Sequence, residues 1–546
     1  MMHLMCLAAL FVVNVFLAVT SSVVALANIP RNGWYDCPLS TFELKPPSED
    51  YNATANFLFT EEKKRISRVL TQCAVFDMPF CHNDTSCTPA PGKTMPLFVK
   101  VIPASVEGSK KALIMLEGGP SVSSATLESL MNKFHRELSG AFHIFTVDHR
   151  GTGRSGLLDC PAAQALSFGS RYSNEIALQE VPNCLKDIHH QFGTNAAAAY
   201  SITNAAKDLA VLIETELADY DVYLHGFSYG TMLLERVMHF SPPQVKGYIL
   251  DSIVADHFEP QGTGNNQVFS NWDDDAKDVS QHFLDLCQKD TAVCGKLLGE
   301  NATATLFNLY DTLDSNASAC STIFYDTLEI KPSIILRVFF FKLLRDLDRR
   351  KFIPTFATRL QRCNAQDKAV ITAILTKNDP AEHRMALDSN IIQDTIVFSE
   401  LWQVPTPSME DIKQQFLASP MYFNKTAAIP IGVSVLGLTG NLDPLTPSKH
   451  ARRHFNNMKG DNKKLVEFPV QPLNFDIPDA LALELFDLDG GAMHGKMHTP
   501  AQGAKDYKSN YRVVGLGLNA LLKHREAKAT RGKYAVYEDA CTGIAS

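Results

Sequence analysis

Short apolar runs that alternate with helical segments are the feature of this sequence that most restricts its fold. Most of the runs are bounded by Gly, Pro or Asp. They lie at residues 97–102, 112–116, 143–147, 222–225, 248–254 and 431–438. Segments with the periodicity of a helix, such as 204–217 and 231–239, lie between some of them. Buried strands that alternate with helices predict a mainly parallel central sheet flanked by helices, which is an α/β fold.

The series of strands is interrupted between residues 254 and 431. Most segments in this interval have helical periodicity, at 275–290, 302–313, 332–347 and 352–362. A helical block inserted into an α/β sheet is expected to form a lid or cap. The predicted organisation is a disulfide-pinned lead-in over 28–95, a first core part over 96–256, a helical lid over 257–429 and a second core part over 430–546.

The first 27 residues predict the compartment. They contain no Lys, Arg, Asp or Glu, and the apolar stretch 7–19 is broken only by Asn14. Small residues at 25–27 are typical of a signal-peptidase site, so we expect a signal peptide cleaved near Ala27. The alternative is an uncleaved membrane anchor, because the segment lacks a basic N-terminal region. After cleavage, the protein is expected to be secreted or to reside in the lumen of the secretory pathway, without stable membrane insertion.

The cysteines are consistent with export. The chain has 12, and Cys6 lies in the predicted signal peptide, so an odd number remains. Close spacing suggests the pairs Cys81 with Cys87, Cys160 with Cys184, Cys287 with Cys294, Cys320 with Cys363 and, further, Cys37 with Cys73. The sequence contains no CxxC pair or Cys/His ligand cluster, so no metal site is predicted. Glycosylation sequons occur at Asn52, Asn83, Asn301, Asn316 and Asn424.

Charge and composition exclude some classes of protein. With 51 basic against 59 acidic residues, the formal net charge is −8, which argues against nucleic acid as a partner. The hydrophobic fraction of 45% is that of an ordinary globular chain and excludes an intrinsically disordered one.

Residues 226–230, with the sequence GFSYG, stand between the strand at 222–225 and the helix at 231–239. A serine in such a strand–turn–helix context is typical of a nucleophile elbow, which exposes the hydroxyl on a tight turn. Glycine is favoured at both flanking positions because a Cβ there would crowd the strand or the helix. We therefore predict Ser228 as a nucleophile.

Two further glycine-rich segments follow early strands. The segment 117–120, EGGP, can direct a backbone N–H of Gly118 or Gly119 toward a developing oxyanion, with the N–H of Tyr229 as its partner. The segment 148–156, DHRGTGRSG, has the glycine spacing of a dinucleotide site, but no helical segment begins at its third glycine. We expect it to be a structural turn that supports the elbow, with no bound cofactor.

The segments EGGP, DHRGTGRS and GFSYG, in this order, resemble the α/β-hydrolase fold and, in particular, the prolyl aminopeptidase and tripeptidyl aminopeptidase family of serine peptidases. That family has the motifs GGPG, DxRGxGxS and GxSxG. The resemblance covers most of the chain after residue 95. This chain differs in having Ser121 in place of the usual Gly after GGP, and Glu117 in place of the usual His before it.

In the α/β-hydrolase fold, the nucleophile is followed along the chain by an acid and then by a histidine. Asp443 follows the strand at 431–438 in a loop similar to the family's acid loop, and is the predicted acid. Asp251 is the alternative. His494, in a loop flanked by Gly, is the predicted base, with His498 as its alternative.

The resemblance implies a secreted serine hydrolase that cleaves peptide bonds near the free N-terminus of peptides, of the aminopeptidase or tripeptidyl-peptidase type. Such an enzyme needs carboxylates for the substrate ammonium group, and Glu117 and Glu259 are candidates. The mechanism requires no metal or organic cofactor. Two alternatives are a carboxylic ester hydrolase that uses the same triad and a catalytically silent binding protein on this scaffold.

Overall fold

The computed structural model describes residues 32–42, 68–82, 87, 92–163, 180–193, 196–254, 272–325, 331–345, 349–377, 387–402, 408, 434–440, 446–458 and 463–468. The chain divides into two compact units, residues 1–477 and 478–546, and all described residues belong to the first. The expected signal peptide lies outside the described residues. The candidate site residues Glu259, Asp443, His494 and His498 also lie outside them.

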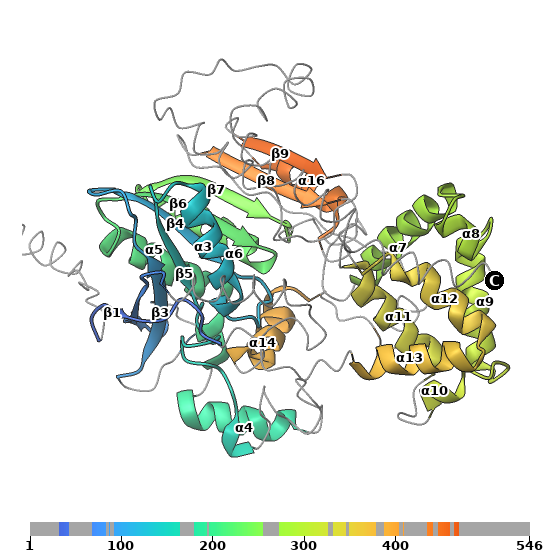
Figure 1. Cartoon of the computed structure of the whole chain (residues 1–546). Helices are drawn as coiled ribbons and strands as arrows, with labels where there is room; N and C mark the ends of the chain where they lie inside the picture. The colour runs from blue at the N-terminus through green and yellow to red at the C-terminus, as the bar shows by residue number, and fades with distance from the viewer. Residues whose placement is uncertain are drawn as a thin grey trace, which may run out of the picture. The chain divides into compact units, whose positions relative to one another are not determined.

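The described residues form one nine-stranded sheet with the strand order β1-β2-β3-β5-β4-β6-β7-β8-β9 (Figure 1). The strands are β1 Tyr35–Asp36, β2 Gln72–Pro79, β3 Thr94–Ile102, β4 Lys111–Leu116, β5 His143–Val147, β6 Asp221–Phe227, β7 Val245–Asp251, β8 Ser434–Gly440 and β9 Lys463–Phe468. Neighbouring strands are parallel from β5 to β9, whereas β1, β2 and β3 pair antiparallel with their neighbours. The sheet is therefore mainly parallel, as predicted.

The strand β2 lies within the range expected to be an extended lead-in. It pairs along its whole length with β3. Ala74, Phe76 and Met78 are fully buried, so apolar side chains at every second residue face the core. The lead-in thus contributes a full strand to the sheet. Strand β7 ends at Asp251, earlier than expected, because Ser252 has a positive φ of 61° and turns the chain out of the sheet.

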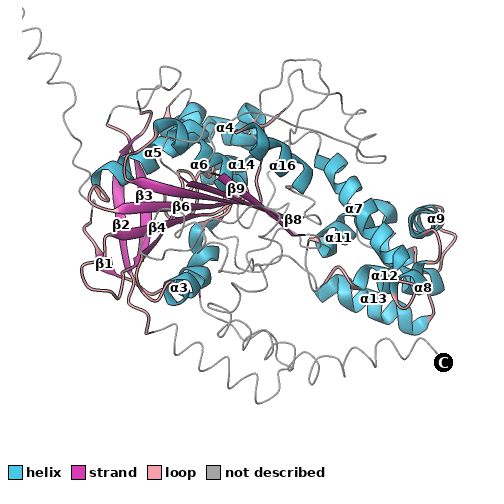
Figure 2. Ribbon diagram, turned by 90° about the horizontal axis from the view of Figure 1, so that it is seen from above, coloured by secondary structure: helices cyan, strands magenta, loops and turns pink. Residues whose placement is uncertain are grey.

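Helices cover both faces of the sheet (Figure 2). They are α3 Glu128–Glu137, α5 Ile202–Thr215, α6 Tyr229–Phe240 and α16 Ser448–Asn457, whereas α4 Val181–Phe192 packs against two short 3-10 helices. Short 3-10 helices lie at Ser124–Leu127, Pro161–Ala163 and Ala196–Tyr200. Two adjacent residues of β6 show the arrangement, since the His225 ring meets Phe134 of α3, whereas Gly226 faces Leu234 of α6. Consecutive strand residues point to opposite faces, so α3 and α6 lie on opposite sides.

A bundle of helices between residues 272 and 377, here called the helical block, has a hydrophobic cluster of its own (Figure 1). Its helices are α7 Trp272–Lys289, α8 Cys294–Leu298, α9 Ala302–Asp314, α10 Thr322–Tyr325, α11 Pro332–Leu344, α12 Phe352–Arg362 and α13 Ala365–Lys377. The cluster buries Leu313, Leu336 and Leu360 completely. The expected helices at 275–290, 302–313, 332–347 and 352–362 correspond to α7, α9, α11 and α12.

The helix α14, Asn390–Glu400, lies within the range expected for the lid but packs elsewhere. Its buried side chains Ile392, Ile396 and Val397 belong to the hydrophobic cluster of the sheet. The segment before it is also bound to the core loops, since Ser389 donates its N–H to the carbonyl of Ser121. Residues 387–402 are therefore part of the sheet region.

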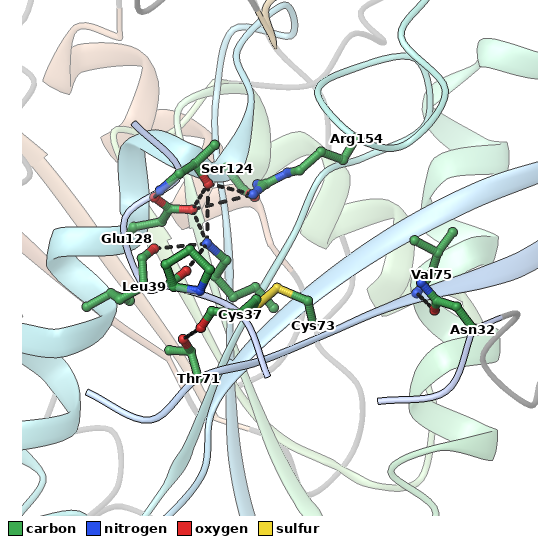
Figure 3. The surroundings of a disulfide bond; sticks show 12 residues. Asn32, Cys37, Leu39, Thr71, Cys73, Val75, Ser124, Glu128 and Arg154 are labelled. Carbon is green, nitrogen blue, oxygen red and sulfur yellow. Dashed lines mark hydrogen bonds and ion pairs between the residues drawn. A yellow bond between two sulfur atoms is a disulfide. The ribbon is translucent and has the colours of Figure 1, made fainter. Parts of the chain in front are cut away.

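Five disulfides form in the described part of the chain, and they are the five pairs that the spacing suggested. Figure 3 shows the surroundings of Cys37–Cys73. This bridge joins the N-terminal segment to the start of β2. Lys100 anchors the same segment, because its buried Nζ donates to the carbonyls of Pro38 and Leu39 and forms an ion pair with Glu128.

The helices within the described ranges include none that has both the length and the apolar character needed to cross a membrane.

Candidate active site

Ser228 stands at the junction of β6 and α6, where the sequence predicts an elbow. Its backbone has φ 52° and ψ −118°, a conformation that non-glycine residues rarely adopt. Its N–H donates to the carbonyl of Asp251 at 2.9 Å, which ties the elbow to the end of β7. Strained residues of this kind are concentrated at active sites, and the strand–turn–helix context is that of a nucleophile elbow.

The two glycines that flank the elbow are required by close backbone contacts. A Cβ on Gly226 would lie 2.4 Å from the carbonyl oxygen of Gly230. A Cβ on Gly230 would lie 2.7 Å from the carbonyl oxygen of Leu116, at the end of β4. Neither backbone can move away without disturbing the sheet, so the crowding predicted from the sequence is confirmed at both positions.

The loop after β4 lies directly against the serine. A Cβ on Gly118 would be 2.9 Å from Ser228 Cβ and 3.5 Å from Ser228 Oγ. Gly119 has φ 117°, which only glycine adopts readily, and the peptide bond between Gly119 and Pro120 is cis. The segment 117–120 therefore occupies the position from which backbone donors can face the reacting group.

The two candidate amides of this loop differ in their environment. The N–H of Gly118 donates to Glu117 Oε1 at 2.8 Å and is thus engaged within the loop. We therefore assign the oxyanion role, within the proposal below, to the amides of Gly119 and Tyr229. Tyr229 is the first residue of α6, where backbone N–H groups have no acceptor within the helix.

The side chain of Glu117 accepts hydrogen bonds that stabilise the loop after β4. This side chain is buried. Oε2 accepts a hydrogen bond from the Thr126 hydroxyl, and Oε1 accepts one from the backbone N–H of Gly118. Burial raises the pKa of the Glu117 carboxyl, although these hydrogen bonds oppose the shift. Because both oxygens already accept hydrogen bonds from groups close by in the chain, we do not propose Glu117 as a ligand for a substrate ammonium group.

A second acid near this loop, Asp388, carries no signal in the sequence that would have identified it. Its Oδ1 accepts the N–H of Ser123 at 3.0 Å. Burial raises its pKa to about 6, and the nearby charge of Asp148 adds to this shift. No sequence pattern marks Asp388, because it lies 265 residues from Ser123 and reaches the loop only through the packing of α14.

A side chain of the segment 148–156 occupies the space inside the turn that the segment forms. The carboxylate of Asp148 lies where a Cβ on Gly153 would be, 2.3 Å from that position. It accepts the N–H of Ser124 at 2.7 Å and both the backbone and side-chain N–H groups of Arg154. Burial opposes ionisation of Asp148, but the charge of Arg154 and these hydrogen bonds hold its pKa below the usual value. A turn that binds its own carboxylate supports the structural role expected for it.

Arg150, in the same segment, is completely buried and holds it to the surrounding chain. Its guanidinium forms a bidentate pair with Asp208 of α5, with distances of 2.8 Å and 2.6 Å. It also donates to the carbonyls of Phe80 and Ala199. His82 contacts the same carboxylate at 2.6 Å. A buried charge with this many partners is rigidly held, and so is the loop that carries it.

Asp251, the alternative acid, has partners on the α3 side of the sheet. Its Oδ1 accepts the Ser252 hydroxyl, and its Oδ2 lies 3.7 Å from His225 Nε2. Burial raises the pKa of the Asp251 carboxyl. Its contact with Ser228 is made through its backbone carbonyl. Asp443 and His494 lie outside the described residues, so the composition of the triad stays a prediction; β8 ends at Gly440, just before Asp443 in the chain.

In the part of the chain that the structure describes, no group of three or more His, Cys, Asp or Glu side chains is arranged to hold a metal ion.

Comparisons with known proteins agree with this geometry at the level of the fold. Residues 111–326 match a family model described as the alpha/beta hydrolase fold. Together with the strand order and the elbow, this match establishes the α/β-hydrolase fold. No curated protein sequence matches the chain.

Several solved structures are similar. The proline iminopeptidase from Mycobacterium smegmatis is 13% identical and has a TM-score of 0.36, over 73% of this chain and 97% of that one. An esterase from Exiguobacterium antarcticum is 14% identical with a TM-score of 0.30, over 73% and 97%. A haloalkane dehalogenase variant from Bradyrhizobium elkanii is 14% identical with a TM-score of 0.32, over 74% and 98%. The names of these three proteins describe different reactions, and none of the reactions is assigned to this chain by the similarity.

Proposed function

We propose that this chain is a secreted serine hydrolase that cleaves peptide bonds near the free N-terminus of peptides. The observation that carries the proposal is the elbow at Ser228, with its strained backbone and the glycine loop 117–120 packed against it. A serine held this way, at the end of a central strand and the start of a helix, is arranged for nucleophilic attack.

The proposed reaction follows the serine-hydrolase scheme. Ser228 Oγ attacks the carbonyl carbon while His494 accepts its proton, and Asp443 orients the imidazole and stabilises its cation. The N–H groups of Gly119 and Tyr229 stabilise the oxyanion. The C–N bond breaks as His494 returns the proton to the leaving amine. Water then attacks the acyl-enzyme, with His494 again acting as the base, and Ser228 is restored.

Specificity for peptide N-termini is supported by the motifs EGGP, DHRGTGRS and GFSYG, whose order resembles the aminopeptidase family. Among the carboxylates suggested for the substrate ammonium group, Glu259 remains, since Glu117 is bound within its own loop. The five disulfides support an oxidising compartment, as expected for export.

The test is a series of fluorogenic peptide amides of one, two and three residues, each with a free and an acetylated N-terminus, with Ser228→Ala as the blank. Cleavage of the free N-termini alone would support the proposal, and the best length would give the number of residues released. Hydrolysis of aryl esters without cleavage of any amide would indicate an ester hydrolase. A serine that does not react with a fluorophosphonate would indicate a binding protein.

A further inference from the structure

His149 touches both elements that supply the proposed oxyanion site. It lies two residues beyond the end of β5 and is 5% exposed. Its Nε2 lies 2.8 Å from the carbonyl oxygen of Pro120, in the loop after β4. Its ring centroid lies 5.3 Å from that of Tyr229, the first residue of α6. One imidazole thus joins the loop that carries Gly119 to the helix start that carries the other proposed donor.

The chemistry of this imidazole is restricted by its burial. Burial lowers the pKa of His149, so the ring is neutral at physiological pH and carries a single N–H. The contact from Nε2 to Pro120 is shorter than the 3.2 Å contact from Nδ1 to the carbonyl of the adjacent Arg150. We therefore assign the N–H to Nε2, which donates to the Pro120 carbonyl.

The rest of the molecule holds His149 firmly in place. The residues on either side of it, Asp148 and Arg150, are fixed by the buried pairs with Arg154 and Asp208. The loop that His149 contacts contains a glycine at φ 117°, a residue without a side chain to fix its own orientation. A rigid donor next to a loop of this kind can determine where the loop amide points.

We propose that His149 is a positioning residue that, by donating to the Pro120 carbonyl, holds the amide of Gly119 in place beside that of Tyr229 for the oxyanion. The proposal rests on the serine chemistry of the proposed function but not on its specificity for peptides. Because an oxyanion donor acts mainly in the transition state, displacing one lowers kcat and leaves KM largely unchanged. A residue that only fills space would lower stability without this selective effect.

Two substitutions separate the two contacts of the ring. His149→Phe keeps an aromatic ring against Tyr229 but removes the donor to Pro120. His149→Gln places an amide N–H near the position of Nε2 but removes the ring. We expect His149→Phe to lower kcat for an aryl ester by about 10- to 100-fold with little change in KM. We expect His149→Gln to retain kcat to within a few-fold.

His143 provides a matched control at the other end of β5. Its Nε2 also contacts a backbone carbonyl, that of Ser109 at 3.2 Å, and its ring centroid also lies 5.3 Å from a tyrosine ring, that of Tyr220. His143→Phe therefore makes the same chemical change away from Ser228. We expect it to leave kcat unchanged.

The measurements are kcat and KM on an aryl ester, the rate of fluorophosphonate labelling and the thermal midpoint of each variant. The proposal is overturned if His149→Phe keeps its kcat, if His149→Gln is as slow as His149→Phe, or if His143→Phe loses as much activity. A wild-type protein that hydrolyses the ester but no peptide would contradict only the proposed specificity. The effect of the His149 substitutions on kcat could still be measured with the ester. A wild-type serine that reacts with neither reagent would overturn both proposals.

Discussion

The sheet region buries more charged side chains than the described part of the helical block does. Around the loops of the sheet region, the structure buries charged groups that pair with one another, such as Arg150 with Asp208 and Lys100 with Glu128. The cluster of the helical block is made of Leu, Ile, Phe and similar side chains. In the described part of the block, the buried polar residues are Ser321, Ser333, Arg350 and Asp367.

This difference reflects what each region must do. Buried ionic groups contribute little net stability, because removing them from water is costly, but they hold their partners in one geometry. In the sheet region they surround the loops next to Ser228. Apolar packing and disulfide cross-links stabilise a folded region without holding individual loops in one geometry. The helical block depends on these two contributions, and its disulfides Cys320–Cys363 and Cys287–Cys294 add to the packing. Changes in the sheet loops should therefore act on catalysis, and changes in the block on stability.

The largest expected effect is that of Ser228→Ala. Loss of the nucleophile should lower the rate of hydrolysis by about 10⁴- to 10⁶-fold with little change in the thermal midpoint. The control is Ser241→Ala, at the exposed far end of the same helix, where the serine also has a positive φ, of 49°. Rates are measured with the best substrate of the peptide series or an aryl ester. Activity retained in Ser228→Ala would remove the assignment of the nucleophile.

The next effect concerns the block. Replacing both Cys320 and Cys363 by Ser opens a cross-link that spans 43 residues, which should lower the free energy of unfolding by about 4 kcal/mol in the chain-entropy model. Denaturant unfolding followed by circular dichroism measures this loss. We expect fluorophosphonate labelling of Ser228 to persist below the transition. If labelling were lost in native buffer, the contrast between the two regions would fail.

A smaller effect compares two glycines. In Gly230→Ala, the new Cβ would meet the carbonyl of Leu116 at 2.7 Å, so we expect a loss of about 1–3 kcal/mol of stability and a marked loss of activity. In the block, Gly299 has φ 75°, but a Cβ added there would have no neighbouring atom within 4 Å. With ψ at −171°, Gly299 lies in a backbone region that is essentially restricted to glycine, so Gly299→Ala should cost about 1–3 kcal/mol through backbone strain alone and leave activity intact. Equal losses of activity in the two variants would contradict the comparison.

The smallest effect depends on pH. The pKa of Asp388 is about 6 in the folded protein, above its ordinary value of 3.8, so the folded state binds the proton more tightly than the unfolded state. Its stabilising contribution is complete below about pH 4 and is lost as the pH rises through about 6. Asp388→Asn, whose amide oxygen can still accept the Ser123 N–H, should therefore be more stable than wild type at pH 8 by roughly 1–2 kcal/mol.

The check is the difference in unfolding free energy between Asp388→Asn and wild type at pH 4 and at pH 8. We expect a difference that grows between these two values. Asp367→Asn in the block is the opposite case, because Arg362 and Arg359 hold the pKa of Asp367 below its usual value. That variant should lose stability at pH 8. A pH-independent difference for Asp388→Asn would show that folding does not raise the pKa of the Asp388 carboxyl.

Much of the fold was predictable because local patterns and global structure agree. The apolar runs at 112–116 and 143–147 became β4 and β5 with nearly the same bounds, since a strand buried on both faces needs continuous apolar residues. The disulfide pairs were predictable because the paired cysteines are close in sequence. Strand β2 was missed because its signal is an alternation inside a segment rich in Pro and Cys.

For the site, the sequence by itself determined the position of the elbow at Ser228 and of the loops around it. Ser228, Gly226 and Gly230 are adjacent in the chain, and their contacts follow from the turn that they form. The loops at 117–120 and 148–156 follow neighbouring parallel strands, so the order of the strands brings them together.

Only the tertiary structure decided which side chains complete these loops. Asp388 meets Ser123, Glu117 turns back on Gly118, and His149 reaches both Pro120 and Tyr229. The residues in these contacts are far apart in the chain or depend on one rotamer of a buried side chain. No periodicity or motif specifies such contacts, because they arise when helices and loops pack and each buried polar group must find a partner.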